Sequence, residues 1–142
     1  MDRREFIATV GTVAVIASAA QTFAQAAEQP TMHPPQYKAL EEAAAHCVAT
    51  ANGCLRHCLG MFAMKDASMS GCANAAYQVI AACGALQALA AVNSPHVAAV
   101  AKGVELVCKD CQKECEKWPK IAECKACGES CGSCAEECGK AA

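Results

Sequence analysis

Large aromatic side chains are scarce in this sequence. Its 142 residues include three Phe, two Tyr and one Trp, and both Phe6 and Phe23 fall within the first 26 residues. A chain of this length can form one domain of ordinary size. Because it has so few large apolar side chains, that domain needs another means of holding its interior together. Disulfides or bound metal are the usual substitutes.

An excess of charge of either sign is missing as well. There are 12 basic and 14 acidic residues, giving a net charge of −2 with no basic patch, so we expect no nucleic-acid partner. No segment alternates between polar and apolar residues as a strand would. The sequence also lacks a glycine-rich nucleotide loop, a Ser-His-Asp set and a carboxylate pair at a plausible pocket. It therefore does not predict an enzyme.

Cysteine, in contrast, is abundant. It occupies 13 of the 142 positions, a density typical of disulfide scaffolds and metal proteins. Residues 124–138 follow the pattern Cys-x2-Cys-x3-Cys-x2-Cys-x3-Cys. On an α-helix this spacing places every cysteine on one stripe, where a bundle helix normally carries Leu, Ile or Val facing the core. The pattern predicts a helix whose core-facing stripe consists of thiols.

Residues 1–26 predict a twin-arginine export signal that is cleaved off. An Arg-Arg-Glu-Phe motif at 3–6 precedes an apolar run at 7–20, and Ala-Gln-Ala at 24–26 supplies a small-x-small cleavage site. The run is too short to span a membrane comfortably, and we expect no membrane span in the mature chain. A generic secretory signal is the alternative. We expect export by the twin-arginine route to the periplasm or an associated internal membrane compartment.

The rest of the chain predicts an all-α fold. Residues 27–35 form a linker, since Pro30, Pro34 and Pro35 cannot lie inside a helix. Ser94 is a predicted helix N-cap and Gly139 a predicted helix stop. We expect an antiparallel four-helix bundle over residues 36–142, with helices at about 36–65, 72–92, 95–117 and 119–138.

Each predicted helix carries its cysteines on a single face. The spacings between successive cysteines are 7 and 4 residues in the first helix, 11 in the second, 3 and 4 in the third, and 3, 4, 3 and 4 in the fourth. We therefore expect one interior lined with sulfur. We take the turn after the first helix and the turn after the third helix to lie at the same height at one end of the bundle. Counting depth from that end at about 1.5 Å per residue places Cys54 beside Cys83, Cys108 and Cys131. At the other end we expect an apolar plug of Leu86, Leu89, Val92, Val97, Val100 and Val104. The predicted metal ligands are Cys47, Cys54, Cys58, Cys72, Cys83, Cys108, Cys111, Cys115, Cys124, Cys127, Cys131, Cys134 and Cys138.

One end of this column has soft donors of its own. His57, Met61 and Met64 follow one another at steps of 4 and 3, and Met69 lies in the adjoining turn. Methionine more often fills gaps in a core. Its position beside a thiol column, however, makes a metal entrance an equal alternative.

Three chemistries could use these thiols. Disulfides suit an exported chain, but the number of cysteines is odd and neighbours one turn apart on a helix are not a normal bridging pattern. Structural zinc suits the Cys-x2-Cys pairs, although zinc prefers closed four-ligand sites. Thiolate with thioether is the ligand set that selects Cu(I), and a thiol column could hold about one Cu(I) per cysteine. Copper fits both the spacing and the methionines.

The twin-arginine motif, the four cysteine-striped helices and the motif at 124–138 resemble the exported bacterial copper storage proteins. The resemblance covers essentially the whole mature chain. It implies a four-helix bundle, usually a homotetramer, that binds many Cu(I) ions in its interior. It also implies an entrance at His57, Met61, Met64 and Met69. Finally, it implies supply of copper to a copper-dependent oxidase such as methane monooxygenase, with the copper donor and recipient left open.

Overall fold

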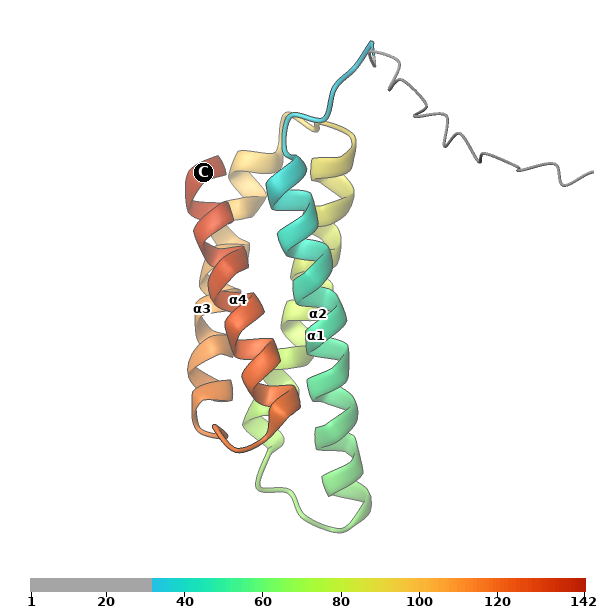
Figure 1. The fold of residues 1–142 in the computed structure, drawn as a ribbon, viewed down its shortest axis with the longest axis vertical. Helices are drawn as coiled ribbons and strands as arrows, with labels where there is room; N and C mark the ends of the chain where they lie inside the picture. The colour runs from blue at the N-terminus through green and yellow to red at the C-terminus, as the bar shows by residue number, and fades with distance from the viewer. Residues whose placement is uncertain (1–31) are drawn as a thin grey trace, which may run out of the picture. The chain divides into compact units, whose positions relative to one another are not determined.

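The structure, a computed structural model, describes residues 32–142. The predicted export signal and most of the predicted linker lie outside the described residues. Four helices follow one another: α1 (Lys38–Ala63), α2 (Ser70–Ala91), α3 (Val97–Glu116) and α4 (Ala122–Ala141). They run up and down as an antiparallel bundle (Figure 1), and residues 32–142 contain no strand. The predicted all-α four-helix fold is confirmed.

The helices form a square in which α1 packs against α2 and α4, and α3 packs against the same two helices. Each helix buries one stripe. In α1 the stripe is Leu40, Ala44, Cys47, Ala51, Cys54 and Cys58. Its steps of 4 and 3 are those of a coiled-coil seam, which keeps one face of a helix turned toward its partners along its whole length. The cysteines are therefore core residues of an ordinary bundle geometry.

Most helix ends differ from the prediction by one to three residues; the largest shift at a start is that of α4, which begins at Ala122 rather than near 119. Ser94 does not cap α3, because the helix begins at Val97; the Ser94 hydroxyl instead accepts a hydrogen bond of 3.2 Å from the His96 amide in a preceding turn. Gly139 does not stop α4, which continues to Ala141. A glycine inside a helix costs only about 1 kcal/mol relative to alanine. The pair between Lys140 and Glu137, at 2.6 Å, joins residues of this last turn.

Asn93 fastens the chain before α1 to the turn between α2 and α3. Its Nδ2 donates a 3.1 Å hydrogen bond to the carbonyl of Pro34, and its Oδ1 accepts one of 2.8 Å from the amide of Gln36. Asn93 has a φ of 51°, a conformation that asparagine tolerates better than most residues. The end of the bundle opposite the methionines is thus tied together by one side chain.

The predicted apolar plug is correct in part. Leu86, Val97 and Val104 are buried in the core, whereas Val92 is 73% exposed because it lies just past the end of α2. Leu89 and Val100 are half-buried and pack against the core from its edge.

Among the described residues, α2 alone is long and apolar enough to cross a membrane by length and composition. Its 22 residues have a mean hydropathy of 1.2 in the most apolar window, of which 33% is buried. Core helices of soluble bundles meet the same criterion of length and composition.

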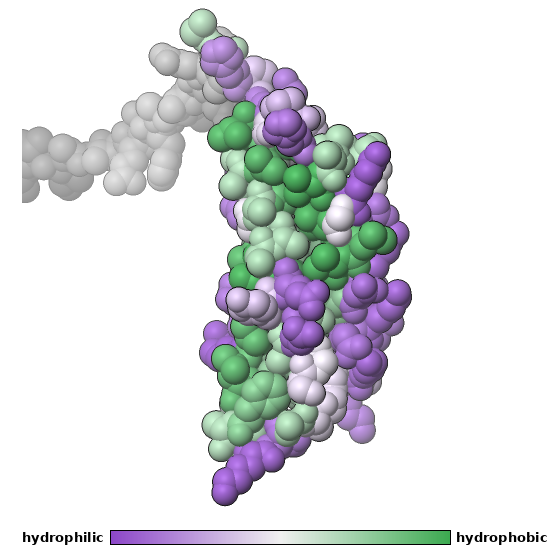
Figure 2. Space-filling view, turned by 180° about the vertical axis from the view of Figure 1, so that it is seen from behind, coloured by the Kyte–Doolittle hydropathy of each residue, from purple (hydrophilic) through white to green (hydrophobic). Residues whose placement is uncertain are grey.

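Figure 2 shows the bundle from behind, with hydrophobic residues gathered along the α2 side and hydrophilic residues along the α3 side.

Candidate metal centre

All thirteen cysteines point into the bundle. None is more than 2% exposed, and all are free thiols. They come from all four helices, with three each from α1 and α3, two from α2 and five from α4. The structure therefore places every cysteine of the predicted ligand set in one interior.

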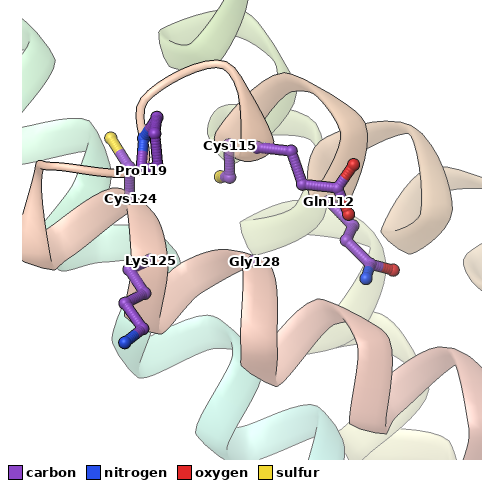
Figure 3. A pocket seen from close by; sticks show the side chains of 7 residues that line it. Gln112, Cys115, Pro119, Cys124, Lys125 and Gly128 are labelled. Carbon is purple, nitrogen blue, oxygen red and sulfur yellow. The ribbon is translucent and has the colours of Figure 1, made fainter.

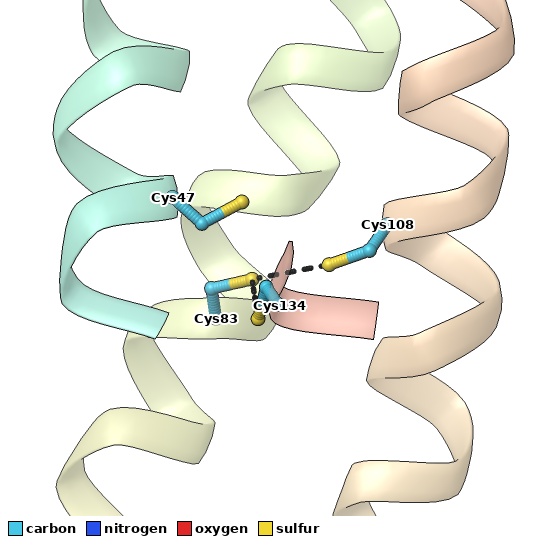
Figure 4. Close-up of side chains that lie close together, drawn as sticks. All are labelled: Cys47, Cys83, Cys108 and Cys134. Atoms are coloured by element: carbon cyan, nitrogen blue, oxygen red, sulfur yellow. Dashed lines mark hydrogen bonds between the residues drawn. The ribbon is translucent and has the colours of Figure 1, made fainter. Parts of the chain in front are cut away.

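A group of four thiols lies in the far half of the column (Figure 4). Cys47, Cys83, Cys108 and Cys134 come from one helix each, and their sulfurs all lie within 4.8 Å of one another. The Cys83 Sγ is 3.5 Å from the Cys108 Sγ and 3.8 Å from the Cys134 Sγ. A disulfide bond measures about 2.05 Å, so these are contacts between separate thiols. Sulfurs at this spacing can share one metal ion.

A second group lies toward the methionine end. Cys54, Cys58 and Cys72 have their sulfurs within 4.8 Å of one another. The Cys54 Sγ is 3.3 Å from the Cys72 Sγ and 3.7 Å from the Cys124 Sγ, and Cys72 and Cys124 are 3.8 Å apart. This group therefore draws on α1 and α2, and Cys124 of α4 lies against it.

Shared members join the groups into one column. Cys54 also belongs to a group with Cys115 and Cys127, and Cys127 belongs to the next group with Cys111 and Cys131. The Cys131 Sγ then lies 3.5 Å from the Sγ of Cys47 in the four-thiol group. An ion bound in one group could therefore pass to the next group through a thiol that the two groups share or through a contact between two thiols.

The predicted depth of Cys54 is wrong. It was expected beside Cys83 and Cys108, but its sulfur contacts Cys72 and Cys124, nearer the methionine end. The prediction took the α1–α2 turn and the α3–α4 turn as level. Figure 1 shows the α1–α2 turn extending beyond the other one, which shifts every α1 cysteine relative to α3 and α4.

Burial and mutual hydrogen bonding separate the pKa values of the thiols. Burial raises the pKa of Cys58 to about 11 and that of Cys124 to about 12, because a thiolate is poorly solvated in the core. Hydrogen bonds from the Cys115 and Cys54 thiols lower the pKa of Cys72 to about 3. Neighbouring thiols therefore favour a thiolate at Cys72, whereas Cys58 and Cys124 favour the protonated form. A metal ion that binds protonated thiols must displace their protons.

His57, Met61 and Met64 line a cavity of about 390 Å³ at the end of α1. The Nε2 atom of His57 is buried without a hydrogen-bond partner, and its Nδ1 lies 3.9 Å from the Glu123 carboxylate. Met64 is 70% exposed. One histidine, two methionines and a carboxylate thus line this cavity.

Met69 is placed differently from the other three predicted entrance residues. It is fully buried in the same core cluster as the cysteines and does not line this cavity. Arg56 and Glu123 line it instead, and the sequence reasoning missed both. The sequence did contain a hint of both residues, because Arg56 directly precedes His57 and Glu123 directly precedes Cys124.

The sequence reasoning also missed a polar contact inside the bundle. The hydroxyls of Thr50 and Ser130 lie 2.5 Å apart between α1 and α4, and the Ser130 hydroxyl donates a 2.9 Å hydrogen bond to the carbonyl of Cys127. Both hydroxyls are satisfied by these bonds and by backbone carbonyls, so burying them carries little cost.

Comparison with known proteins connects this geometry to a family. A family model described as copper storage protein matches residues 33–142. Copper storage protein 3 from Bacillus subtilis, in its apo form, is 26% identical, with a TM-score of 0.65 over 73% of this chain and 96% of that one.

The Cu(I)-bound structure of copper storage protein BsCsp3 is 27% identical, with a TM-score of 0.65 over 74% of this chain and 97% of the other. No curated protein matches the chain. The family match covers most of the sequence and all of the bundle. The chain therefore belongs to the copper storage protein family.

Proposed function

We propose that this protein stores copper by binding many Cu(I) ions, about one per cysteine, to thiolates inside the bundle. The observation that carries the proposal is that eleven of the thirteen buried thiols fall into four groups, in each of which the sulfurs lie within 4.8 Å of one another. Thiolates select Cu(I). Each bound ion also offsets thiolate charge that could not otherwise remain buried.

Structural zinc and disulfides fit the thiol geometry less well. Zinc prefers four ligands in a closed tetrahedral site, and only Cys47, Cys83, Cys108 and Cys134 form such a group in the described part of the chain. The other three groups have three members each and share Cys54 and Cys127. Cu(I) accepts two or three sulfurs, and thiolates can bridge two ions. Overlapping groups of three therefore favour copper.

The cavity at the end of α1 supports a route for loading. His57 Nε2 and the two methionine sulfurs are donors that can bind Cu(I) for a short time, and Cys58 follows His57 directly in the sequence. An ion bound there would reach Cys58, Cys54 and Cys72 next. The proposed activity is uptake and release without chemical turnover.

The test is an anaerobic titration of the reduced protein with Cu(I) in competition with a chromophoric chelator. We expect saturation at about 13 Cu(I) per chain, matching the thirteen thiols. Saturation at one to three ions would contradict storage and favour the zinc alternative. A parallel titration with Zn²⁺ is the control, and it should saturate far below the copper value.

We further propose export by the twin-arginine route and supply of copper to an oxidase such as methane monooxygenase. The Arg-Arg-Glu-Phe motif at 3–6 and the resemblance to exported copper storage proteins support this. The expected results are a mature chain that lacks residues 1–26 in the periplasm or an internal membrane compartment, and slower loss of oxidase activity when copper is withdrawn from cells that contain the protein. A chain that keeps its leader in the cytoplasm would contradict the export proposal.

A homo-oligomer, a tetramer by resemblance, is proposed through the outer face of α2. Tyr77 is 65% exposed there, and Ala81, Ala85 and Ala88 are exposed at helical spacing on the same helix. Small residues let a second helix approach closely, as the apolar α2 side in Figure 2 would permit. Light scattering should give a multiple of the chain mass, and Tyr77→Glu should reduce it. Lys102→Glu on α3 is the matched control.

A further inference from the structure

A second cavity reaches the thiol column from the side, between α3 and α4 (Figure 3). It measures about 360 Å³ and is lined by Cys115 of α3, Cys124 of α4, Gln112, Lys125 and Gly128. In Figure 3 the sulfur of Cys115 lies in the space between the two helices. Two core thiols thus form part of the wall of a cavity that opens on the protein surface.

This cavity is distinct from the one that holds the methionines. The methionine cavity lies between α1 and the start of α4 and includes Glu123, whereas this one lies on the α3 side and includes Cys124 and Lys125. The two cavities share no lining residue. Consecutive residues of the first turn of α4 therefore face different openings.

Gly128 lines the side cavity at the point where α4 approaches Cys115 closely. A Cβ atom at this position would lie 3.2 Å from the Cβ of Cys115, which is tighter than ordinary van der Waals contact. Glycine inside a helix costs about 1 kcal/mol relative to alanine, and this one lies in the middle of α4. The close approach of α4 to Cys115 accounts for that cost.

The two thiols of the cavity lead directly into the column. The Sγ of Cys124 is 3.7 Å from that of Cys54, and Cys115 shares a group with Cys54 and Cys127 in which all sulfurs lie within 4.8 Å. An ion received by either thiol therefore has Cys54 as its next ligand. The cavity is connected to storage sites rather than isolated from them.

We propose that this cavity is a side port where Cu(I) is exchanged with a small anionic thiol that carries it; the proposal rests on the storage function above. The carrier's Cu–S bond breaks as a Cu–S bond to Cys115 forms, the Cys115 proton passes to the leaving thiolate, and no electron is transferred. A cavity of about 360 Å³ has the size of a small-molecule site rather than a protein-binding surface. The Lys125 ammonium attracts the carrier's carboxylate, although Glu116 also borders the cavity.

The first experiment compares two alanine variants of the full chain under anaerobic conditions. Gly128→Ala places a methyl group 3.2 Å from the Cβ of Cys115 in the wall of the port, whereas a methyl group at Gly139, in the same helix, meets nothing within 4 Å. We expect Gly128→Ala to slow loading from Cu(I)–glutathione severalfold and Gly139→Ala to leave it unchanged, with equal helicity by circular dichroism. Equal loading rates in the two folded variants would overturn the port.

The second experiment does not depend on packing, because Lys125 has a side chain that is 66% exposed. Lys125→Glu should slow loading from Cu(I)–glutathione by roughly tenfold at low salt, the lower end of electrostatic steering effects. Loading from the neutral complex of 2-mercaptoethanol should not change. Lys140→Glu, at the other end of α4, is the control. Slowing of both carriers alike, or of neither, would overturn the proposal.

These outcomes separate the port from storage itself. If storage is correct and the port is wrong, the wild-type protein still saturates near 13 Cu(I), and the variants load at the wild-type rate. If storage is wrong, the wild-type stoichiometry falls to a few ions whichever carrier delivers them.

Discussion

The two ends of the bundle interior use the same helical seam for different purposes. In α2 the buried stripe changes from Cys72 and Cys83 to Leu86, and in α3 it changes from Val97 and Val104 to Cys108. The seam geometry does not change at these points, because a thiol and a small alkyl group both fit a buried position. The aliphatic end packs without metal. At the thiol end, cysteines that lose their protons need bound metal ions to offset the negative charge of the thiolates.

This contrast explains how an empty store can remain folded. Aliphatic side chains contribute about 1.5–3 kcal/mol each when buried, and those of Leu86, Val97 and Val104 are buried at this end. The thiol side chains are smaller than Leu or Val, so each buries less apolar surface, and they contact one another through their sulfurs. The aliphatic end therefore supplies much of the stability of the empty protein, while the thiol end gains most when copper binds.

The largest expected effect is that of copper on unfolding. Because the ligands are far apart in the unfolded chain, binding energy becomes folding energy. We expect full loading to raise the free energy of unfolding by more than about 5 kcal/mol, since several ions contribute. Anaerobic guanidinium unfolding of apo and loaded protein measures this. An unchanged midpoint would mean that the thiol end needs no metal, contrary to the comparison.

The next prediction tests the two ends on a single helix. Leu86 and Cys83 lie three residues apart on α2, and both are fully buried. Leu86→Ala should cost about 2–5 kcal/mol in both apo and loaded protein, without changing the copper stoichiometry. Cys83→Ala should cost the apo-protein only about 1 kcal/mol but lower both the bound copper and the stabilisation on loading. Denaturant unfolding and copper titration distinguish the two variants. Equal losses of copper would contradict the division of roles.

Much of this arrangement could be predicted from the sequence, because a stripe at steps of 3 and 4 determines both the helix and its buried face. Four such stripes joined by short turns predicted the bundle and the burial of every cysteine. The relative height of the helices could not be predicted in the same way. It depends on how far the α1–α2 turn extends, which misplaced Cys54 relative to Cys83.

Features made by contacts between helices were also beyond the sequence. The port between α3 and α4 depends on the approach of Gly128 to Cys115, and a mid-helix glycine alone does not reveal what it faces. Met69 shows the converse. Its place in a turn among other methionines left a metal entrance and core packing as equal alternatives, and the chain folds it fully into the core, where methionine commonly fills irregular gaps.

A pH prediction concerns the thiol end alone. Cys58 and Cys124 have an ordinary pKa of 9.0, raised in the folded protein to about 11 and about 12. Between the unfolded pKa of 9.0 and the folded values of about 11 and about 12, the folded protein binds more protons than the unfolded chain. Its stability therefore falls as pH rises through this range. The contribution is fully present below pH 9.0 and is lost by about pH 12.

We expect the apo-protein to lose at least about 2 kcal/mol over this range, since the shift on Cys58 alone corresponds to about 2.7 kcal/mol at about 1.36 kcal/mol per unit of pKa. Copper-loaded protein should show no such loss, because its thiolates carry no protons. Unfolding of both forms at pH 8, 9, 10 and roughly 11 checks this. The Cys58→Ala variant is the control, since it should lose less stability with pH than the wild type. A parallel decline in apo and loaded protein would assign the effect to groups outside the column.

The smallest effect is expected at the aliphatic end, where Asn93 fastens the chain before α1. Asn93→Gly keeps the φ of 51° accessible but removes the two hydrogen bonds to Pro34 and Gln36. The expected cost is about 1 kcal/mol, since each exposed hydrogen bond contributes little net stability. Asn93→Ala adds the strain of a positive φ and should cost about 1 kcal/mol more. Thermal unfolding measures both variants. Because the change lies outside the thiol column and opposite the methionine end, copper stoichiometry and loading rate should match the wild type. A loss of bound copper in Asn93→Gly would mean that the two ends of the bundle are not independent.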